Sequence, residues 1–304
     1  MHTVVLGAGV AGITSAWYLA AQGRQVTVID RQPLAASETS YANAGMVAPG
    51  HSYTWASPRA PGILWRSLRD STQALRLKLN ADPHMWVWLW KFLQNCTAER
   101  SRINTGRKLV LCRYSQERLQ ELTATLGLEY ERISQGALYM YRDAASFQRG
   151  QANMRILSDG GMRLDVLDAD GVIAREPALA SARQHIAGAI YCPSDESGDA
   201  RMFTRALAER CRAAGVRFLM DTSIDRIEAR GDRIAAVHTS AGPVTADEYV
   251  LSLGSYSPIL ARPLGYSLPI YPVKGYSVTF PIGEGHQPPT FAVVDENNLV
   301  AWAR

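Results

Sequence analysis

The chain has little net charge, few cysteines and no long apolar run. Its 32 basic and 28 acidic side chains leave a net charge of only +4, which is too weak to indicate a protein that binds nucleic acid. The four cysteines, Cys96, Cys112, Cys192 and Cys211, form no Cys-x-x-Cys pair, so we expect reduced structural thiols and no metal site. No stretch approaches the about 20 apolar residues that span a bilayer. These absences favour a cytoplasmic globular protein.

The N-terminus is apolar but is not typical of a secretory signal. No basic segment precedes the apolar residues, and glycines interrupt them at positions 7, 9 and 12, so we do not expect a cleaved leader. A length of 304 residues suggests about two domains. Hydrophobic residues make up 47% of the chain, which is enough for a packed core.

The first thirty residues have the pattern of a dinucleotide-binding βαβ unit. Residues 3–6 form a β-branched run typical of a buried strand, residues 13–22 have a helical pattern, and residues 25–29 form a second apolar strand. Gly23 is placed to end the helix. The sequence Gly-Ala-Gly-Val-Ala-Gly joins the first strand to the helix, and Asp30 follows the second strand. This combination is much more specific than the glycine motif alone.

Each part of such a unit has a physical role. Gly7 permits the tight turn, Gly9 lets a pyrophosphate approach the backbone, and Gly12 lets the helix pack against the strand. The free N–H groups at the start of the helix receive phosphates. Asp30 is placed to bond ribose hydroxyls, which argues against the 2′-phosphate of NADP. The residues expected to line the cofactor here are Val5, Leu6, Gly7, Ala8, Gly9, Val10, Ala11 and Gly12.

FAD and NAD both use this unit, so the segment after Asp30 matters. Residues 37–46, Ser-Glu-Thr-Ser-Tyr-Ala-Asn-Ala-Gly-Met, are small and polar and fit neither a core strand nor a strong helix. Such a segment can lie beneath an extended cofactor and offer it backbone N–H groups. Composition alone, however, favours a plain surface loop.

The segment 80–95 is unusually aromatic, with Trp86, Trp88, Trp90 and Phe92. A buried helix is the favoured interpretation, because the segment is apolar nearly all round. The alternative is a contact with a membrane surface, which would be helped by the nearby basic residues Arg100, Arg102, Arg107 and Lys108.

The rest of the chain alternates helical and strand patterns. Helices are expected at 107–126, 146–159 and 202–214, and strands at 136–141, 186–192, 216–220 and 223–230, with a hairpin at 233–246. The first of these helices should turn Val110, Tyr114, Leu122 and Leu126 towards the core. Residues 248–253 form an apolar strand that ends at Gly254, where a doubly wound fold binds ligands, although an ordinary strand end is equally compatible.

Several stretches of the chain are together similar to one protein family. They include GAGVAGITSAWYLA, ETSYANAGMVAPG, HMWVWLWKFLQNC, PSDESGDARMFTRALAERCRAAGV and LPIYPVKGYS. The glycine turn occurs in many flavoproteins, whereas the Asn-Ala-Gly loop and the Tyr-Pro-Val-Lys-Gly-Tyr-Ser string are more specific. The chain resembles the FAD-dependent D-amino-acid dehydrogenases (small subunit) of the D-amino-acid oxidase superfamily.

The resemblance implies an α/β fold with a doubly wound, Rossmann-like FAD-binding domain and an inserted substrate domain on a mixed or antiparallel sheet. The FAD-binding domain would comprise residues 1–80 and 185–260, and the substrate domain residues 81–184 and 261–304. At matching positions, Asp30 would bond the ribose, Arg31 would lie near the adenine, and Gly254 would lie at the cofactor edge. The Ile224 backbone would meet the adenine. The residues that would line the flavin are Ser40, Asn43, Ala44, Gly45 and Met46.

The reaction that the resemblance implies is transfer of a hydride from the α-carbon of a D-amino acid to the flavin, followed by hydrolysis of the imino acid to a keto acid and ammonia. Electrons would pass to a quinone or dye, with nucleic acid excluded as a partner. A neutral substrate amine needs no strong base. Lys274 and His51 are candidates for positioning substrate or flavin, with solvated side chains as the alternative.

Three alternatives remain open at this stage. One is a glycine or sarcosine oxidase of the same superfamily, and another is an inactive fragment, since members of the family continue well beyond residue 304 and residues 298–304 would then be an unpaired strand. The third, an NAD-dependent dehydrogenase, is disfavoured by the segment that follows Asp30.

Overall fold

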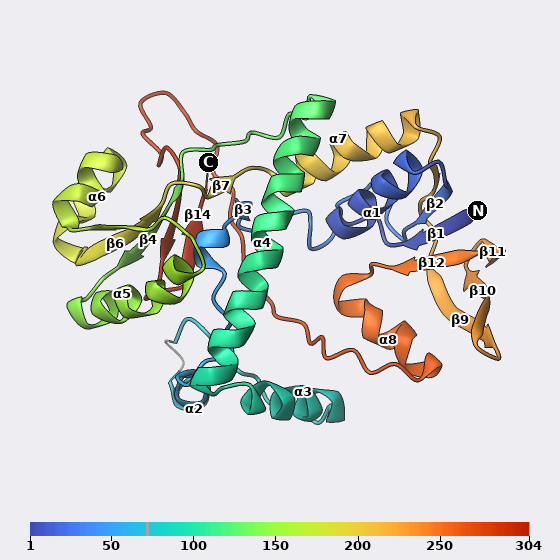
Figure 1. Ribbon diagram of the computed structural model, residues 1–304, viewed down its shortest axis with the longest axis horizontal. Coiled ribbons are helices and arrows are strands. Elements are labelled where there is room, and N and C mark those ends of the chain that lie inside the picture. The colour runs from blue at the N-terminus through green and yellow to red at the C-terminus, as the bar shows by residue number, and fades with distance from the viewer. Residues whose placement is uncertain (71–72, 304) are drawn as a thin grey trace. The chain divides into compact units, whose positions relative to one another are not determined.

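The computed structural model describes residues 1–70 and 73–303. The chain divides into two compact units (Figure 1). Unit 1 comprises Met1–Asn43, Thr123–Tyr130 and Asp199–Ser277, and unit 2 comprises Ala44–Leu122, Glu131–Gly198 and Val278–Arg304. Which functional domain each residue belongs to stays a prediction.

A parallel sheet forms the centre of unit 1. Its strand order is β12-β1-β2-β8, with β1 at His2–Leu6, β2 at Gln25–Ile29, β8 at Arg217–Leu219 and β12 at Glu248–Leu251. Counted along the chain, this is the order 4-1-2-3, that of a Rossmann-like sheet, and the order reverses between β1 and β12. The predicted doubly wound sheet is confirmed, and a ligand site is expected at this reversal.

Two helices pack together beside the parallel sheet, α1 (Val10–Ala21) and α7 (Ala200–Ala213). The N-terminal turn of α7 is capped by Asp199, whose side chain accepts the Met202 N–H at 2.8 Å. Ile13 and Leu207 are fully buried. Their apolar side chains supply the burial that holds such helices against a sheet.

An antiparallel sheet of three strands is inserted between β8 and β12. It comprises β9 (Ile224–Arg230), β10 (Arg233–Thr239) and β11 (Gly242–Val244). Val237 packs with Val4 and Leu6 in one apolar cluster, so the insertion shares a core with the parallel sheet. After β12 the chain forms short helical turns, including α8 (Ser257–Ala261) and the 3-10 turns Gly254–Tyr256 and Arg262–Leu264.

Unit 2 is built on a mixed sheet of order β14-β13-β4-β6-β5. The strands are β4 (Ala137–Tyr141), β5 (Asp165–Leu167), β6 (Gly188–Cys192), β13 (Ala292–Asp295) and β14 (Val300–Trp302). Among the strands described in this sheet, β13 and β4 pair in parallel and the other neighbours are antiparallel, and Figure 1 shows red β13 and β14 beside green β4. Alternate strand residues point to two separate apolar clusters, one with Tyr139 and one with Leu138, so both faces of this sheet are covered.

The helices of unit 2 are α2 (Ala60–Arg69), α3 (Pro83–Gln94), α4 (Ala98–Leu126), α5 (Ala144–Asp159) and α6 (Ala169–Arg175), with 3-10 turns at Pro49–His51 and Pro177–His185; α4 continues into unit 1. The segment 80–95 does contain a helix, α3, but its expected burial is wrong, because Met85 is the one buried residue of α3 and Trp90 is 64% exposed. The apolar face expected for α4 is wrong in part: Leu122 is buried, but Val110 and Tyr114 are exposed.

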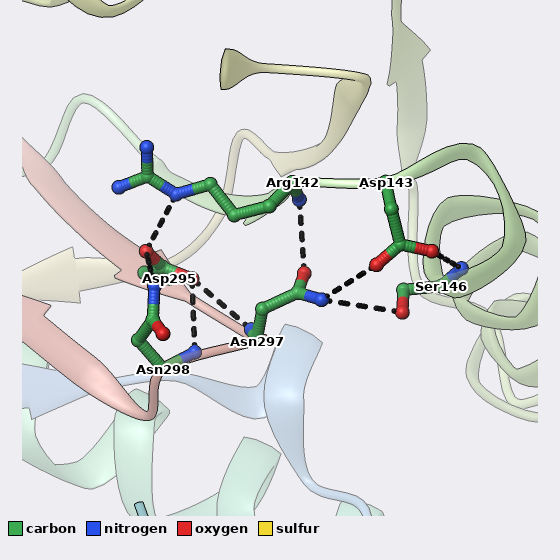
Figure 2. A network of polar contacts seen from close by, with 6 residues as sticks. All are labelled: Arg142, Asp143, Ser146, Asp295, Asn297 and Asn298. Carbon is green, nitrogen blue, oxygen red and sulfur yellow. Dashed lines mark hydrogen bonds and ion pairs between the residues drawn. The ribbon is translucent and has the colours of Figure 1, made fainter. Parts of the chain in front are cut away.

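A polar network closes the turn between β13 and β14 (Figure 2). The buried Asp295 carboxylate accepts the Arg142 Nε at 2.8 Å and the backbone N–H groups of Asn297 and Asn298 at 3.1 Å each. The Asn297 amide donates to Asp143 at 2.7 Å. Because β14 pairs with β13, the expectation of an unpaired strand at 298–304 is wrong for the described residues 300–302.

Candidate functional site

The three glycines of the first turn have different surroundings. A Cβ on Gly12 would lie 1.8 Å from the Gly7 carbonyl oxygen, and one on Gly7 would lie 2.7 Å from the Ser252 oxygen. Both glycines are therefore required for close packing of backbone on backbone. A Cβ on Gly9 would meet only the Ser40 hydroxyl, at 3.3 Å. Gly9 thus leaves space above the backbone, as a pyrophosphate requires.

The start of α1 offers unused hydrogen-bond donors. The first helical bond runs from Ile13 N–H to the Gly9 carbonyl, and the Val10 N–H donates to the Ser40 hydroxyl at 3.0 Å. Within the described residues, the N–H groups of Ala11 and Gly12 have no partner. The first turn also carries no acidic side chain. Such a helix start attracts anions through its free donors and its dipole.

Asp30 faces the same turn from the end of β2. Its carboxylate accepts the Ala8 N–H at 2.7 Å and the Gln32 N–H at 2.8 Å. An ionised carboxylate has about four acceptor positions, so two stay open for hydroxyl donors. The side chain is half-buried, which leaves it within reach of a ligand at the edge of the sheet.

Arg31 brings the end of β2 together with the segment after β12. Its guanidinium lies 2.6 Å from Glu38 and 4.3 Å from the centre of the Tyr256 ring. Hydrogen bonding to Tyr256, then to Glu38, raises the pKa of Arg31. Gly254 begins this segment with φ of +54° and open space at its Cβ position. The expected cofactor residues Arg31 and Gly254 therefore belong to one edge of unit 1.

Other expected cofactor residues offer only their backbone to a ligand. Val5 and Leu6 are fully buried in the core, so only their main chain is available to a ligand. Ile224 opens β9 opposite Thr239 and packs in the same apolar cluster as Leu6.

The segment 37–46 is divided between the two units. Ser40 is buried against the start of α1 in unit 1, and Asn43 is the last residue there. Ala44, Gly45 and Met46 belong to unit 2, where β3 (Met46–Val47) pairs with β7 (Glu196–Ser197). Gly45 has φ of +61°, and a Cβ there would lie 2.4 Å from the Gly198 oxygen, so glycine is required.

His51 and Lys274 have very different surroundings. The His51 Nε2 lies 2.6 Å from the Glu296 carboxylate, and its ring stacks on Tyr139 with 4.6 Å between ring centres. Lys274 is exposed in an irregular segment of unit 1 and lies 5.2 Å from the centre of its neighbour's ring, Tyr276. His51 is thus held in place by its neighbours, whereas Lys274 is not.

The sequence patterns missed several ordered polar groups. Ser252 donates to the Leu6 carbonyl at 2.7 Å at the point where the strand order reverses. Asp195 and Tyr139 are buried and bonded to each other at 2.5 Å. Nothing in a local sequence pattern distinguishes a buried carboxylate such as that of Asp195 from a solvated one.

The residues of unit 1 fit an adenine dinucleotide such as FAD. An open approach at Gly9, unused N–H donors at Ala11 and Gly12, and spare acceptors on Asp30 supply what a pyrophosphate and a ribose need. Among the described residues there is no cluster of metal-ligating side chains. The open backbone at Gly9, the free donors and the Asp30 carboxylate suit a bound dinucleotide.

Comparisons with known proteins agree with this geometry. The family profile described as "FAD dependent oxidoreductase" matches residues 2–303. Over the whole chain, 46% of residues are identical to a D-amino acid dehydrogenase of Bradyrhizobium diazoefficiens and 45% to one of Agrobacterium fabrum, of which the chain covers 72% and 73%.

Solved structures show the same fold at low sequence identity. Glycine oxidase from Bacillus cereus superposes with a TM-score of 0.60 at 22% identity, over 86% of this chain and 57% of that one. L-proline dehydrogenase from P. horikoshii superposes with a TM-score of 0.56 at 17% identity, over 87% of this chain and 56% of that one. The chain thus spans less than two thirds of these solved proteins.

Proposed function

This chain belongs to the FAD dependent oxidoreductase family, and from that membership we propose that it oxidises D-amino acids to 2-oxo acids and ammonia. Electrons then pass to a quinone or another acceptor of the respiratory chain. The substrate class follows from relatives that are 42–46% identical and carry the name D-amino acid dehydrogenase. The cofactor follows from the family itself, which is FAD-dependent.

The observation that carries the proposal is the open turn at Gly9. The N–H groups of Ala11 and Gly12 bind the pyrophosphate, and Asp30 accepts hydroxyls of the adenosine ribose. The backbone of Val5 to Ala8 lines the turn, and Arg31, Ile224 and Gly254 lie along the adenosine side. Of the three glycines in this turn, Gly9 is the one whose added Cβ would meet no backbone atom, so the diphosphate approaches the chain at this residue.

The flavin side of the cofactor is proposed to meet Ser40, Asn43, Ala44, Gly45 and Met46. When bound, FAD supplies the acceptor for the hydride that leaves the substrate α-carbon. The protein's own contribution is to bind and orient both molecules and to exclude water from the reacting atoms. No acid or base is assigned, because hydride transfer from a neutral amine requires none. His51 is retained as a positioning candidate, and exposed Lys274 as a weaker one.

Glycine oxidation is the competing activity, suggested by the superposition on glycine oxidase. At 22% identity that likeness shows the fold alone. The test offers D-alanine, L-alanine, glycine and sarcosine to the purified flavoprotein with a dye acceptor and, separately, with oxygen. Dye reduction by D-alanine with little peroxide supports the proposal. Rapid peroxide formation from glycine or sarcosine, without D-alanine turnover, would replace it with the oxidase.

A respiratory acceptor such as a quinone lies in a membrane, so the proposed electron transfer favours a peripheral contact of this protein with a membrane surface. Both α2 and α3 carry exposed apolar side chains, a set that we call the tryptophan face: Trp65, Leu68, Trp86, Val87, Trp90 and Leu93. The segment 59–94 carries the basic residues Arg59, Arg66, Arg69, Arg76, Lys78 and Lys91 against the acidic Asp70 and Asp82. Aromatic residues with surrounding positive charge are typical of helices that lie on anionic bilayers. No helix in residues 1–70 or 73–303 is long and apolar enough to cross a membrane.

Vesicle binding tests this contact. The protein should sediment with vesicles that contain anionic lipid, and Trp86→Ala with Trp90→Ala should abolish this binding without loss of bound flavin. Tyr266→Ala, which removes an exposed aromatic residue of unit 1, is the matched control. Equal binding of the tryptophan variant and the control would contradict a role for this face.

A further inference from the structure

Asp195 is a fully buried carboxylate at the centre of unit 2. Its Oδ2 accepts the Tyr139 hydroxyl at 2.5 Å, and its Oδ1 accepts the Gly50 N–H at 2.9 Å. Its side chain is 0% exposed, and burial raises the pKa of Asp195. Burying a carboxylate costs free energy unless hydrogen bonds compensate for the lost water, and here two bonds do so. The two bonds connect the sheet, through Tyr139, to the 3-10 turn Pro49–His51.

The residues after Asp195 hold the chain before Gly50. Glu196 and Ser197 pair with Val47 and Met46 in the short antiparallel ladder of β3 and β7. Gly198 then donates its N–H to the Gly45 carbonyl at 2.8 Å. Four consecutive residues, 195–198, therefore contact the segment 45–50 along its length. We call the residues 195–198 the acidic strap.

The acidic strap is itself fixed from two other elements. The Glu196 carboxylate, 3% exposed as a residue, accepts the Arg132 Nε at 2.5 Å and the Gln116 amide at 3.3 Å. Ser197 exchanges backbone bonds of 2.8 and 2.9 Å with Ile133. The Ser197 hydroxyl is buried and has no partner within the described part of the chain. The strap is thus held firmly, and the Ser197 hydroxyl next to Met46 remains available as a hydrogen-bond donor.

We propose that Asp195 is a positioning residue for the flavin. By bonding Gly50 and Tyr139 it anchors the acidic strap, and the strap in turn holds the backbone of Gly45 and Met46, the residues proposed to face the isoalloxazine ring. The inference rests on the proposed flavin contacts of Gly45 and Met46. A carboxylate suits the task because it accepts two donors from opposite sides. An amide in its place has only one acceptor oxygen, so if that oxygen keeps the Gly50 N–H, the amide NH2 group faces the Tyr139 hydroxyl, which must then accept instead of donate.

The test compares three variants of the full-length flavoprotein. Asp195→Asn keeps the shape of the side chain but removes one acceptor. Tyr139→Phe removes a single donor and leaves the bond to Gly50. Tyr191→Phe is the matched control, because its hydroxyl is also partly buried and donates to the Gln135 carbonyl at 2.7 Å in the apolar cluster on the other face of the sheet.

We expect the FAD dissociation constant to rise about ten- to hundredfold for Asp195→Asn and about two- to tenfold for Tyr139→Phe. The visible absorption band and the reduction potential of the bound flavin should shift in both variants and stay unchanged in Tyr191→Phe. A purely structural role would lower stability in all three variants without moving the spectrum or the potential. That result would overturn the inference.

The outcome is separable from that of the proposed function. If Gly9→Val abolishes flavin binding but Asp195→Asn and Tyr139→Phe leave the spectrum and the potential of the flavin unchanged, FAD binds at the turn and the role of Asp195 is refuted. If Gly9→Val retains flavin, the proposed cofactor site itself fails.

Discussion

The hydroxyl of Ser40 accepts the backbone N–H of Val10 at 3.0 Å, so a residue 30 positions further along the chain caps helix α1. The N-cap position itself is Gly9, which has no side chain to do so. Because Ser40 supplies the cap, the Val10 N–H is satisfied while the backbone at Gly9 stays accessible. It also fixes the first half of the segment 37–46 at the phosphate end of the proposed site.

Removal of this remote cap should weaken both the fold and the cofactor site. Ser40→Ala is expected to lower the free energy of unfolding by about 0.5–2 kcal/mol, the usual cost of losing an N-cap, and to weaken FAD binding. Ser37→Ala is the control, because its hydroxyl donates to the Leu34 carbonyl at an exposed position. Chemical denaturation of the apoprotein and flavin titration are the measurements. Identical behaviour of the two variants would show that the cap is unimportant.

Substitutions of the two glycines Gly9 and Gly12 should affect flavin binding and folding differently. Gly9→Val is expected to abolish flavin binding while the protein stays folded, because the space that it fills is the approach of the diphosphate. Gly12→Ala should instead prevent folding, since its Cβ would lie 1.8 Å from a carbonyl oxygen. Gly106→Ala in α4, with nothing within 4 Å of the added Cβ, is the control. Circular dichroism and flavin content per chain are the readouts, and full flavin content in folded Gly9→Val would contradict the assignment.

Loss of the Asp30 charge should weaken cofactor binding without affecting the fold. Asp30→Asn is expected to weaken FAD binding about tenfold, since charge-assisted bonds to ribose hydroxyls are lost. Asp225→Asn, at an exposed position of β9, controls for the change in net charge. Flavin titration at fixed ionic strength is the measurement. An unchanged affinity in Asp30→Asn would remove the carboxylate from the site.

The turn in Figure 2 predicts a pH dependence of stability. Burial alone would raise the pKa of Asp295, but hydrogen bonds from Asn298 and Arg142 outweigh it and hold the pKa below its ordinary value. Such a group stabilises the folded state above its unfolded pKa of about 4, and this contribution is lost as the pH falls through the folded pKa.

The comparison of wild type with Asp295→Asn measures this contribution. The difference in the free energy of unfolding should be about 1–3 kcal/mol at neutral pH, because the variant loses the charge-assisted bonds of the carboxylate while solvent still screens the partly exposed Arg142. It should shrink as the pH falls below about 4. A difference that stays constant from neutral to acid pH would refute the role of the ionised carboxylate.

The parts of the fold that local patterns determine were predictable from the sequence. The turn from Gly7 to Gly12 and Asp30 depends on residues within one βαβ unit, so spacing alone placed it correctly. The parallel pairing of β13 with β4 joins Ala292 to Ala137, and no local pattern records such a partner. Trp90 was expected to be buried because its neighbours are apolar, but exposure depends on which elements pack against a helix. The hydrogen bonds of Asp195 likewise join it to residues far away in the sequence, Gly50 and Tyr139.

The most direct measurement is anaerobic addition of substrate to the purified flavoprotein. Bound FAD should lose its visible absorption on addition of D-alanine, and should keep it on addition of L-alanine or glycine. The chromophore released on denaturation should be FAD. A protein that carries no flavin, or a flavin that glycine bleaches and D-alanine does not, would contradict an FAD-dependent dehydrogenase of D-amino acids.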